Sequence, residues 1–552
     1  MGHLMFYLAV VAACLLWSAA FVAAAARTER TWLRRLLVAA AVIVPPLALA
    51  PWVGLTAVLA FVQRLHVNWF GPTLTAFLAA IIGGLWVRAA GLSRDDSRGG
   101  FVAARWPVVG LAAMFVMAKA VAFGTLLFID NAVAAEGRAL RVEASQLMMA
   151  NIPPQPLPDD NAAPLYLRAA AAITADKTLF TEAAPASQPL TTDIAAPEVA
   201  AVLARHAATL ELLRRAADRP GCRFVRDWSR PSLDLLLPEV QVMRQAAKLL
   251  ALAARREAVD GDAAAAMRDI LRIRRIGEHV DAEPILICGL VSQALDMMAL
   301  QTLVDVLPRL KKADLELLDQ TPLRDFLEVP MSFDRHFLGE EAFGLATVAD
   351  LADGRVGWSF LTMLQSEDGK LFPEPLVGLP IAFLLRTFLL PSDIDGYRNF
   401  MSRYQQITAS MSGPPPKSFV EVKKQIDTAE QELGSRRAGL FTGLMAPALS
   451  SVMKSQVKGR ALHRAAEVLV AATRARLSTG EIPDELSALV SAQLPAVPRD
   501  PFTADQPLLA KRSNDTLVVY SVGPDGEDDG GPPAADAEKK ADNDDVGLRL
   551  AL

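Results

Sequence analysis

Long apolar runs dominate the first quarter of the chain. Each run meets the requirement of about 20 apolar residues for a helix that spans a bilayer. The runs are 4–26, 36–62, 69–90 and 106–129. Tryptophans lie near their ends, where amphipathic rings settle at the membrane interface. The pattern therefore predicts a four-helix transmembrane domain over residues 1–130.

The connectors between these runs predict an orientation. Connectors 27–35 and 88–105 are rich in arginine, whereas 63–68 holds a single arginine. Because basic loops favour the cytoplasmic side, two crossings must separate the two basic connectors, and 36–62 counts as one span. The N-terminus and everything after residue 130 are then extracytoplasmic, which indicates a multi-pass protein of the cytoplasmic (inner) membrane.

Two features leave the topology open. Residues 1–26 could be a cleaved signal peptide, although the lack of a positive charge before the apolar run favours an uncleaved helix. Segment 376–391 is very apolar and could be a buried helix, a surface-bound helix or a fifth crossing that returns the C-terminus to the cytoplasm.

Lys119, within the fourth run, has no acidic partner in any predicted span, which disfavours an ion pathway.

The hydrophobic pattern after residue 130 is mainly that of amphipathic helices. Residues 131–198 contain a proline-rich linker and the first soluble helices, and 199–437 form a predicted helical extracytoplasmic domain with one helix over 199–219. Gly261 is placed to end one helix and Asp262 to cap the next. This hairpin resembles a tetratricopeptide-type unit, but no steady 34-residue period follows. An ordinary helical bundle is preferred over a concave peptide-binding surface.

The pattern changes again in residues 438–552, which predict a small α+β module. An amphipathic helix is expected over 459–479, ended by Gly480, followed by a short helix over 484–491. A hairpin around 503–516 and a strand over Leu517–Val522 come next, and then an acidic tail. The predicted fold class is thus mainly α, with this small sheet at the C-terminal end.

Charge and cysteine content narrow the class of protein. Residues 1–130 carry ten Lys and Arg against four Asp and Glu, a net charge of +6, while the whole chain is at −5, so residues 131–552 carry −11. An acidic body argues against a nucleic-acid partner. Cys222 and Cys288 could form a disulfide outside the cytoplasm, but two buried free thiols are preferred.

The C-terminal residues carry a resemblance to a known family. RLSTGEIPDELSAL, VPRDPFTADQPL, VVYSVGPDG and DNDDVG occur in this order. Together they resemble the calcium-binding globular domain of the type II secretion major pseudopilin, over residues 459–549. Residues 436–456 (RRAGLFTGLMAPALSSVMKSQ) echo the start of a pilin, but the early glutamate is missing, the apolar run is short and the segment lies deep inside the chain, so a filament subunit is not expected. As a whole, the chain resembles a group of bacterial multi-pass membrane proteins with a helical middle and this same tail.

The resemblance implies a calcium site in the acidic loop. Its expected ligands are Val522 (through its carbonyl), Asp525, Asp528, Asp529, Asp544 and Asp545. From 525 to 545 nine acidic residues stand against two lysines, and a cation would offset their repulsion. A solvated, disordered acidic tail is the alternative.

Motifs for catalysis are few. H-E-x-x-H, G-x-S-x-G and a glycine-rich phosphate loop are all missing from the sequence. Asp334, His336, Glu340 and Glu341 could form an acid–base or metal site of a hydrolase, although an exposed charged helix face is the more common meaning of such a group. The leading hypothesis is therefore a non-enzymatic scaffold or interaction protein. Its partners would be the lipid bilayer and other envelope proteins, in secretion or pilus-type machinery.

Overall fold

A computed structural model describes most of the chain after residue 133. The described residues are 134–176, 194–231, 237–328, 332–352, 390–412, 417–434, 440–533 and 544–552, except 484, 492, 504 and 514, together with positions 24, 27, 29, 30 and 33. Outside them lie the four predicted spans, apart from position 24, as well as Lys119 and positions 376–389 of the segment 376–391. The chain divides into two units, 1–138 with 350–392 and 139–349 with 393–552. The second unit is described below.

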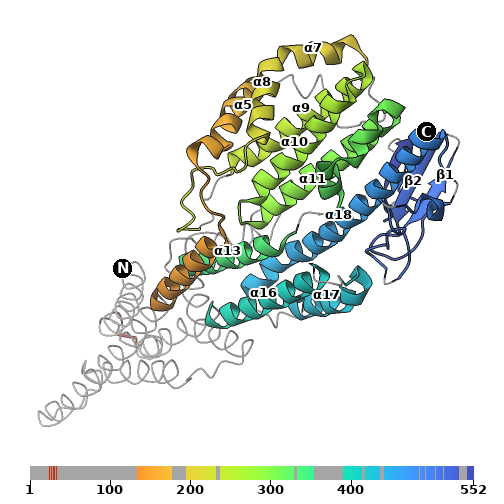
Figure 1. Cartoon of the computed structure of the whole chain (residues 1–552). Helices are drawn as coiled ribbons and strands as arrows, with labels where there is room; N and C mark the ends of the chain where they lie inside the picture. Colours follow the sequence, from red (N-terminus) through yellow and green to blue (C-terminus); the bar gives the residue numbers. More distant parts are fainter. Residues whose placement is uncertain are drawn as a thin grey trace, which may run out of the picture. The chain divides into compact units, whose positions relative to one another are not determined.

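Helices build most of this unit, which confirms the mainly α prediction. After a helix over 134–151, the chain forms α5 (Ala163–Ala175), α7 (Pro197–Arg205), α8 (Ala207–Ala217), α9 (Pro238–Asp260), α10 (Ala263–Asp281) and α11 (Leu286–Val306). Figure 1 shows α9, α10 and α11 side by side at the centre of these helices. Gly261 ends α9 with φ +90°, and Asp262 caps α10 by accepting the Ala265 N–H at 2.9 Å, as predicted. The single helix expected over 199–219 is instead two helices that meet at His206.

Helix α11 is the apolar centre of the unit. By length and hydropathy, Leu286–Arg309 is the one helix among the described residues that could cross a bilayer, with a mean hydropathy of 1.4. However, 67% of its most apolar window is buried inside the protein. A helix that is hydrophobic all round is expected where neighbours cover every side, and α9, α10 and the C-terminal helix α18 (Leu440–Thr479) all pack on α11.

Shorter elements surround this centre. They are η1 (Pro158–Asp160), η3 (Leu307–Arg309), η4 (Lys312–Asp319), α12 (Thr321–Glu328), α13 (Asp334–Ala352), α16 (Leu390–Ser412) and α17 (Phe419–Gly434). Helix α17, which is rich in Lys and Glu, packs on α18.

The C-terminal segment has the predicted order of a long helix, a short helix and a small antiparallel sheet. Helix α18 begins 19 residues earlier than the predicted helix, and η6 (Leu486–Leu489) replaces the predicted short helix. The sheet has the order β1-β2-β3, with β1 at Leu509–Arg512, β2 at Thr516–Ser521 and β3 at Val546–Ala551. Strand β3 was not predicted. It pairs with all six residues of β2, from Thr516 opposite Ala551 to Ser521 opposite Val546.

One apolar core runs through the helical region and the sheet. Leu295 of α11, Leu469 of α18, Val519 of β2 and Leu548 of β3 are all buried in it. The sheet lies on α18 (Figure 1). Strand β3 also contacts α11. Because the sheet and α18 bury their apolar faces partly against the hairpins, the C-terminal module and the helical region belong to the same compact unit.

Candidate functional site

The two ends of the acidic segment meet at Asp545. This side chain is 7% exposed, and its Oδ2 accepts the backbone N–H groups of Asp529 at 3.1 Å and Gly531 at 2.7 Å. Asp545 directly precedes β3, whereas Asp529 and Gly531 belong to the loop that leaves β2. The carboxylate therefore ties the loop after β2 to the start of β3.

A second contact between these ends involves backbone alone. Gly523 has φ +73°, and a Cβ atom at this position would lie 2.0 Å from the carbonyl oxygen of Asp544. Only glycine tolerates both this φ and this approach without strain. The turn after Val522 and the backbone of Asp544 are thus in contact. The structure therefore brings together the two ends of the acidic segment, one with Val522 and the other with Asp544 and Asp545.

The remaining predicted ligands lie along the exposed part of the loop. Asp525 accepts the Glu527 N–H at 3.1 Å, and Asp528 accepts the Gly530 N–H at 2.9 Å, two local turns that acidic side chains favour. The Tyr520 hydroxyl also donates to Asp528 at 3.0 Å. Burial and this hydrogen bond raise the pKa of Tyr520 to about 12.

Asp545 lies in a field of like charge. Burial raises the pKa of its carboxyl, and the neighbouring charges of Asp528 and Asp529 raise it further, against the opposing effect of the two N–H donors. A bound cation would act in the opposite direction, because it favours the ionised carboxylate.

Asp500 holds the end of β2, where the acidic loop begins, and the sequence pattern did not predict this role. It is 2% exposed; its Oδ1 accepts the Phe502 N–H at 2.8 Å and the Ser521 hydroxyl at 2.7 Å, and its Oδ2 accepts the Val522 N–H at 3.0 Å. Asp500 thereby fixes the end of β2 where the acidic loop begins. The signal was present in the sequence, since an aspartate between Arg499 and Pro501 in a proline-rich turn is a common local hydrogen-bond acceptor.

The ligand atoms of the predicted site are of the type that a hard cation prefers. All six predicted ligands offer oxygen, which Ca²⁺ prefers in loose six- to eight-fold coordination. Within the described ranges, however, no three His, Cys, Asp or Glu side chains gather closely enough to hold a metal ion. Residues 534–543, which complete the loop, lie outside those ranges. The predicted ligands thus match the oxygen chemistry that calcium prefers, but the described side chains alone do not form a coordination shell.

His336, the centre of the alternative hydrolase site, lies in the protein interior and not on an exposed helix face. His336 is fully buried, with its Nε2 3.6 Å from Asp281 Oδ1, so the exposed helix face expected here is wrong for this residue. Burial lowers the pKa of His336 to about 4 and raises that of Asp281 to about 6. Glu340 accepts the Leu286 N–H at 3.4 Å and Glu341 accepts from Gln405 at 2.7 Å, so these side chains bind separate neighbours.

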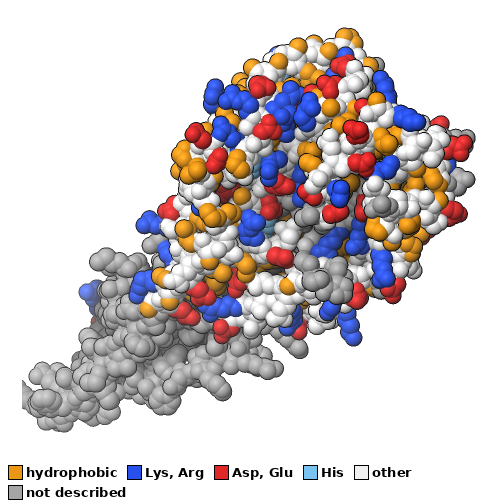
Figure 2. Space-filling model, viewed as in Figure 1, with side chains coloured by type: hydrophobic (Ala, Val, Ile, Leu, Met, Phe, Trp, Pro, Cys, Tyr) orange, Lys and Arg blue, Asp and Glu red, His pale blue; other side chains and the backbone are white. Residues whose placement is uncertain are grey.

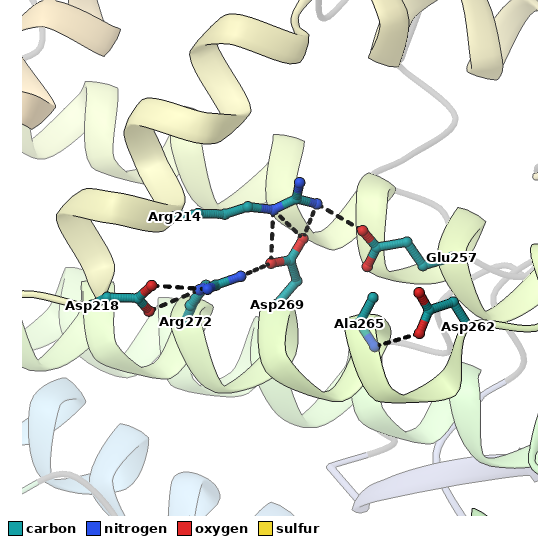
Figure 3. Close-up of polar contacts among 7 residues, drawn as sticks. All are labelled: Arg214, Asp218, Glu257, Asp262, Ala265, Asp269 and Arg272. Atoms are coloured by element: carbon teal, nitrogen blue, oxygen red, sulfur yellow. Dashed lines mark hydrogen bonds and ion pairs between the residues drawn. The ribbon is translucent and has the colours of Figure 1, made fainter.

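An ion-pair network joins three helices of the hairpin region (Figure 3). Asp269 of α10 accepts hydrogen bonds from Arg214 of α8, at 2.6–3.1 Å, and from Arg272 at 2.9 Å. Arg214 also pairs with Glu257 of α9 at 2.7 Å, and burial raises the pKa of Glu257 to about 7. Figure 2 shows basic and acidic side chains interspersed over this region. These contacts hold helices together, which is a structural role.

The cysteines of the helical region are free thiols. Cys222 and Cys288 are both buried and unbridged, as the sequence favoured. Burial raises the pKa of Cys222 far above its usual range and that of Cys288 to about 12. Thiols with such raised pKa values are poor nucleophiles at neutral pH.

Comparisons with protein-family models, curated proteins and solved structures found no match to this chain. A functional proposal therefore depends on the sequence and on the geometry given above.

Proposed function

We propose that this protein is a membrane-anchored scaffold or interaction protein whose body and C-terminal module lie outside the cytoplasm. The module is stabilised by calcium and resembles a pseudopilin domain. Its partners are other proteins of the cell envelope, in secretion or pilus-type machinery. The observation that carries the proposal is the junction at Asp545, where the acidic loop after β2 meets the start of β3.

Calcium has a physical reason to bind at this junction. The loop from 525 to 545 concentrates nine acidic residues, and like charges within a few ångströms repel one another strongly where water is partly excluded. The Val522 carbonyl and the carboxylates of Asp525, Asp528, Asp529, Asp544 and Asp545 would hold the ion. When bound, calcium supplies the positive charge that lets these oxygens lie close together and fixes β3 at the edge of the sheet.

A scaffold role is favoured by how the body uses its polar residues. Buried ionisable groups such as Asp269, Asp296 and Asp500 form contacts between elements. His336, the centre of the alternative hydrolase site, lies in the interior at full burial. The contacts of Asp269 and Asp296 join helices and those of Asp500 hold the end of β2, which suits a protein that presents surfaces to partners.

Calcium should raise the thermal stability of the purified full-length protein. At a free concentration 100 times Kd, binding to the folded state alone contributes about 2.7 kcal/mol, which corresponds to a Tm increase of several degrees. Differential scanning fluorimetry with calcium, magnesium or EGTA measures this shift.

Replacing Asp525 with alanine should remove most of the calcium-induced Tm shift, because the substitution removes one of the expected carboxylate ligands. Asp525 is exposed, so the substitution should leave the fold intact. Asp505→Ala is the matched control, since Asp505 is 86% exposed and lies outside the loop. Equal responses to calcium and EGTA in the native chain would contradict the site.

A further inference from the structure

His463 of α18 is a buried histidine with an acceptor at each ring nitrogen. The side chain is 2% exposed. Its Nδ1 lies 3.1 Å from the carbonyl oxygen of Leu327, and its Nε2 lies 2.6 Å from Oδ2 of Asp296. Neither acceptor can donate, since a carbonyl and a carboxylate carry no proton. Both hydrogen bonds therefore form only when both nitrogens are protonated, which is the positively charged imidazolium.

His279 of α10 provides a contrast within the same protein. It is also buried, but its Nδ1 faces the Tyr166 hydroxyl at 2.9 Å and its Nε2 faces the Arg219 carbonyl at 3.1 Å. One partner donates and the other accepts, so a neutral imidazole satisfies both. Burial lowers the pKa of His279 to about 4, in agreement with a neutral ring.

Asp296 of α11 connects His463 to the hairpin region. It is 1% exposed, and its other oxygen, Oδ1, pairs with Arg274 of α10. Arg274 in turn contacts Glu278 at 3.2 Å and lies over the ring of Phe326. With a protonated His463, two positive and two negative charges balance in this junction, so the buried charges are compensated.

Four elements meet at this point. Asp296, Arg274 and Glu278 come from α11 and α10, Leu327 and Phe326 come from α12, and His463 comes from α18. The Phe326 ring packs edge-on against the His463 ring at a centroid distance of 5.7 Å. The junction therefore fastens the helix that carries the C-terminal sheet to the hairpins.

Other titratable groups also surround the junction. Burial and Glu328 of α12 raise the pKa of Glu467 on α18, whereas Arg464 and His463 lower it. Burial raises the pKa of Asp281, at the end of α10, to about 6 against the charges of Arg335 and Arg274. A test must separate these carboxyls from His463.

We propose that the His463–Asp296–Arg274 junction is a pH-sensitive latch between α18 and the helical hairpins. In its protonated form His463 donates to both Leu327 and Asp296. When the proton is lost as pH rises, one nitrogen lone pair faces an acceptor oxygen, and α18 is held less tightly. The contact of Ser455 with Gln293, at 2.9 Å, keeps α18 on α11, so the latch loosens the helix without releasing it.

Hydrogen–deuterium exchange of the full-length protein in nanodiscs tests the latch. After correction for intrinsic exchange rates, amides of α18 around His463 should be about tenfold less protected at pH 8 than at pH 6, the effect expected for one lost charge-assisted hydrogen bond. Protection of α9, which supplies no residue to the junction, provides the internal reference.

Three variants decide the assignment. His463→Gln should abolish the pH dependence in α18, whereas His279→Gln should leave it unchanged. Asp296→Asn should also abolish it, because the amide can donate to a neutral imidazole, and this variant serves if His463→Gln does not fold. Equal α18 protection at pH 6 and pH 8 in the native chain, or a pH dependence that persists in His463→Gln, would overturn the latch and assign any remaining effect to Asp281 or Glu467.

Discussion

Replacing Asp500 with alanine is expected to lower the free energy of unfolding by about 4 kcal/mol. The substitution leaves three donors without their acceptor, namely the N–H groups of Phe502 and Val522 and the hydroxyl of Ser521. Each unsatisfied buried donor costs about 1–3 kcal/mol, and partial relaxation and water entry reduce the sum. Urea denaturation of the full-length protein in detergent, followed by circular dichroism, measures the loss.

The control for Asp500 is Asp505→Ala in the same turn region. Asp505 is 86% exposed and pairs with a side chain that is itself 71% exposed, Arg499, so its loss should change the free energy of unfolding by less than about 0.5 kcal/mol. A loss for Asp500→Ala that is no larger than this control would show that the carboxylate does not organise the end of β2.

Replacing Gly523 with alanine should cost about 3 kcal/mol. The left-handed backbone at φ +73° costs about 1 kcal/mol for a residue with a Cβ. In addition, the new Cβ would lie 2.0 Å from the Asp544 carbonyl oxygen, so the start of β3 must move away from the turn. The same denaturation measurement, together with hydrogen exchange of β3 amides, should show a less protected strand.

Gly526→Ala separates the two contributions. Gly526 has φ +82°, but no described atom lies within 4 Å of the position that its Cβ would take, so only the backbone cost of about 1 kcal/mol remains. If the two alanine variants lose equal stability, the close approach of Asp544 to the turn is not a feature of the folded protein.

Local signals in the sequence predicted much of the helical region. Gly261 and Asp262 mark the end of α9 and the start of α10, because a left-handed C-terminal residue and an N-terminal acceptor are local requirements. The predicted helix began at residue 459, whereas α18 begins at Leu440 and continues through Gly443 and Pro447, two residue types that are unfavourable inside a helix. The predicted membrane spans remain predictions.

The C-terminal sheet shows where sequence reasoning lost information. Strand β3 follows a long acidic stretch, and this composition hid the alternation of Val546, Leu548 and Leu550 that is typical of a strand. Its partner β2 was predicted from the apolar residues at alternate positions of Leu517–Val522, and it is the second strand of a hairpin with β1. A strand whose pairing requires the closure of a loop of more than about 20 residues has no local signal for its partner.

The polar junctions could not be predicted from local pattern. His463 and Asp296 are separated by 167 positions along the chain. His463 lies between Arg460 and Arg464 in a charged part of α18, whereas Asp296 lies in the apolar helix α11. Such residues resemble exposed positions on their own helices. Only packing of α18 on α11 brings them together and makes one the partner of the other.

The central claim is that the C-terminal module lies outside the cytoplasm, where calcium is available. Alkaline phosphatase fused after residue 552 of the full-length protein tests it directly, because this enzyme becomes active only where its disulfides form. A fusion to a fluorescent protein that matures only in the cytoplasm provides the converse measurement. We predict an active phosphatase fusion and a dark fluorescent fusion; an inactive phosphatase with a bright fluorescent fusion would contradict the claim.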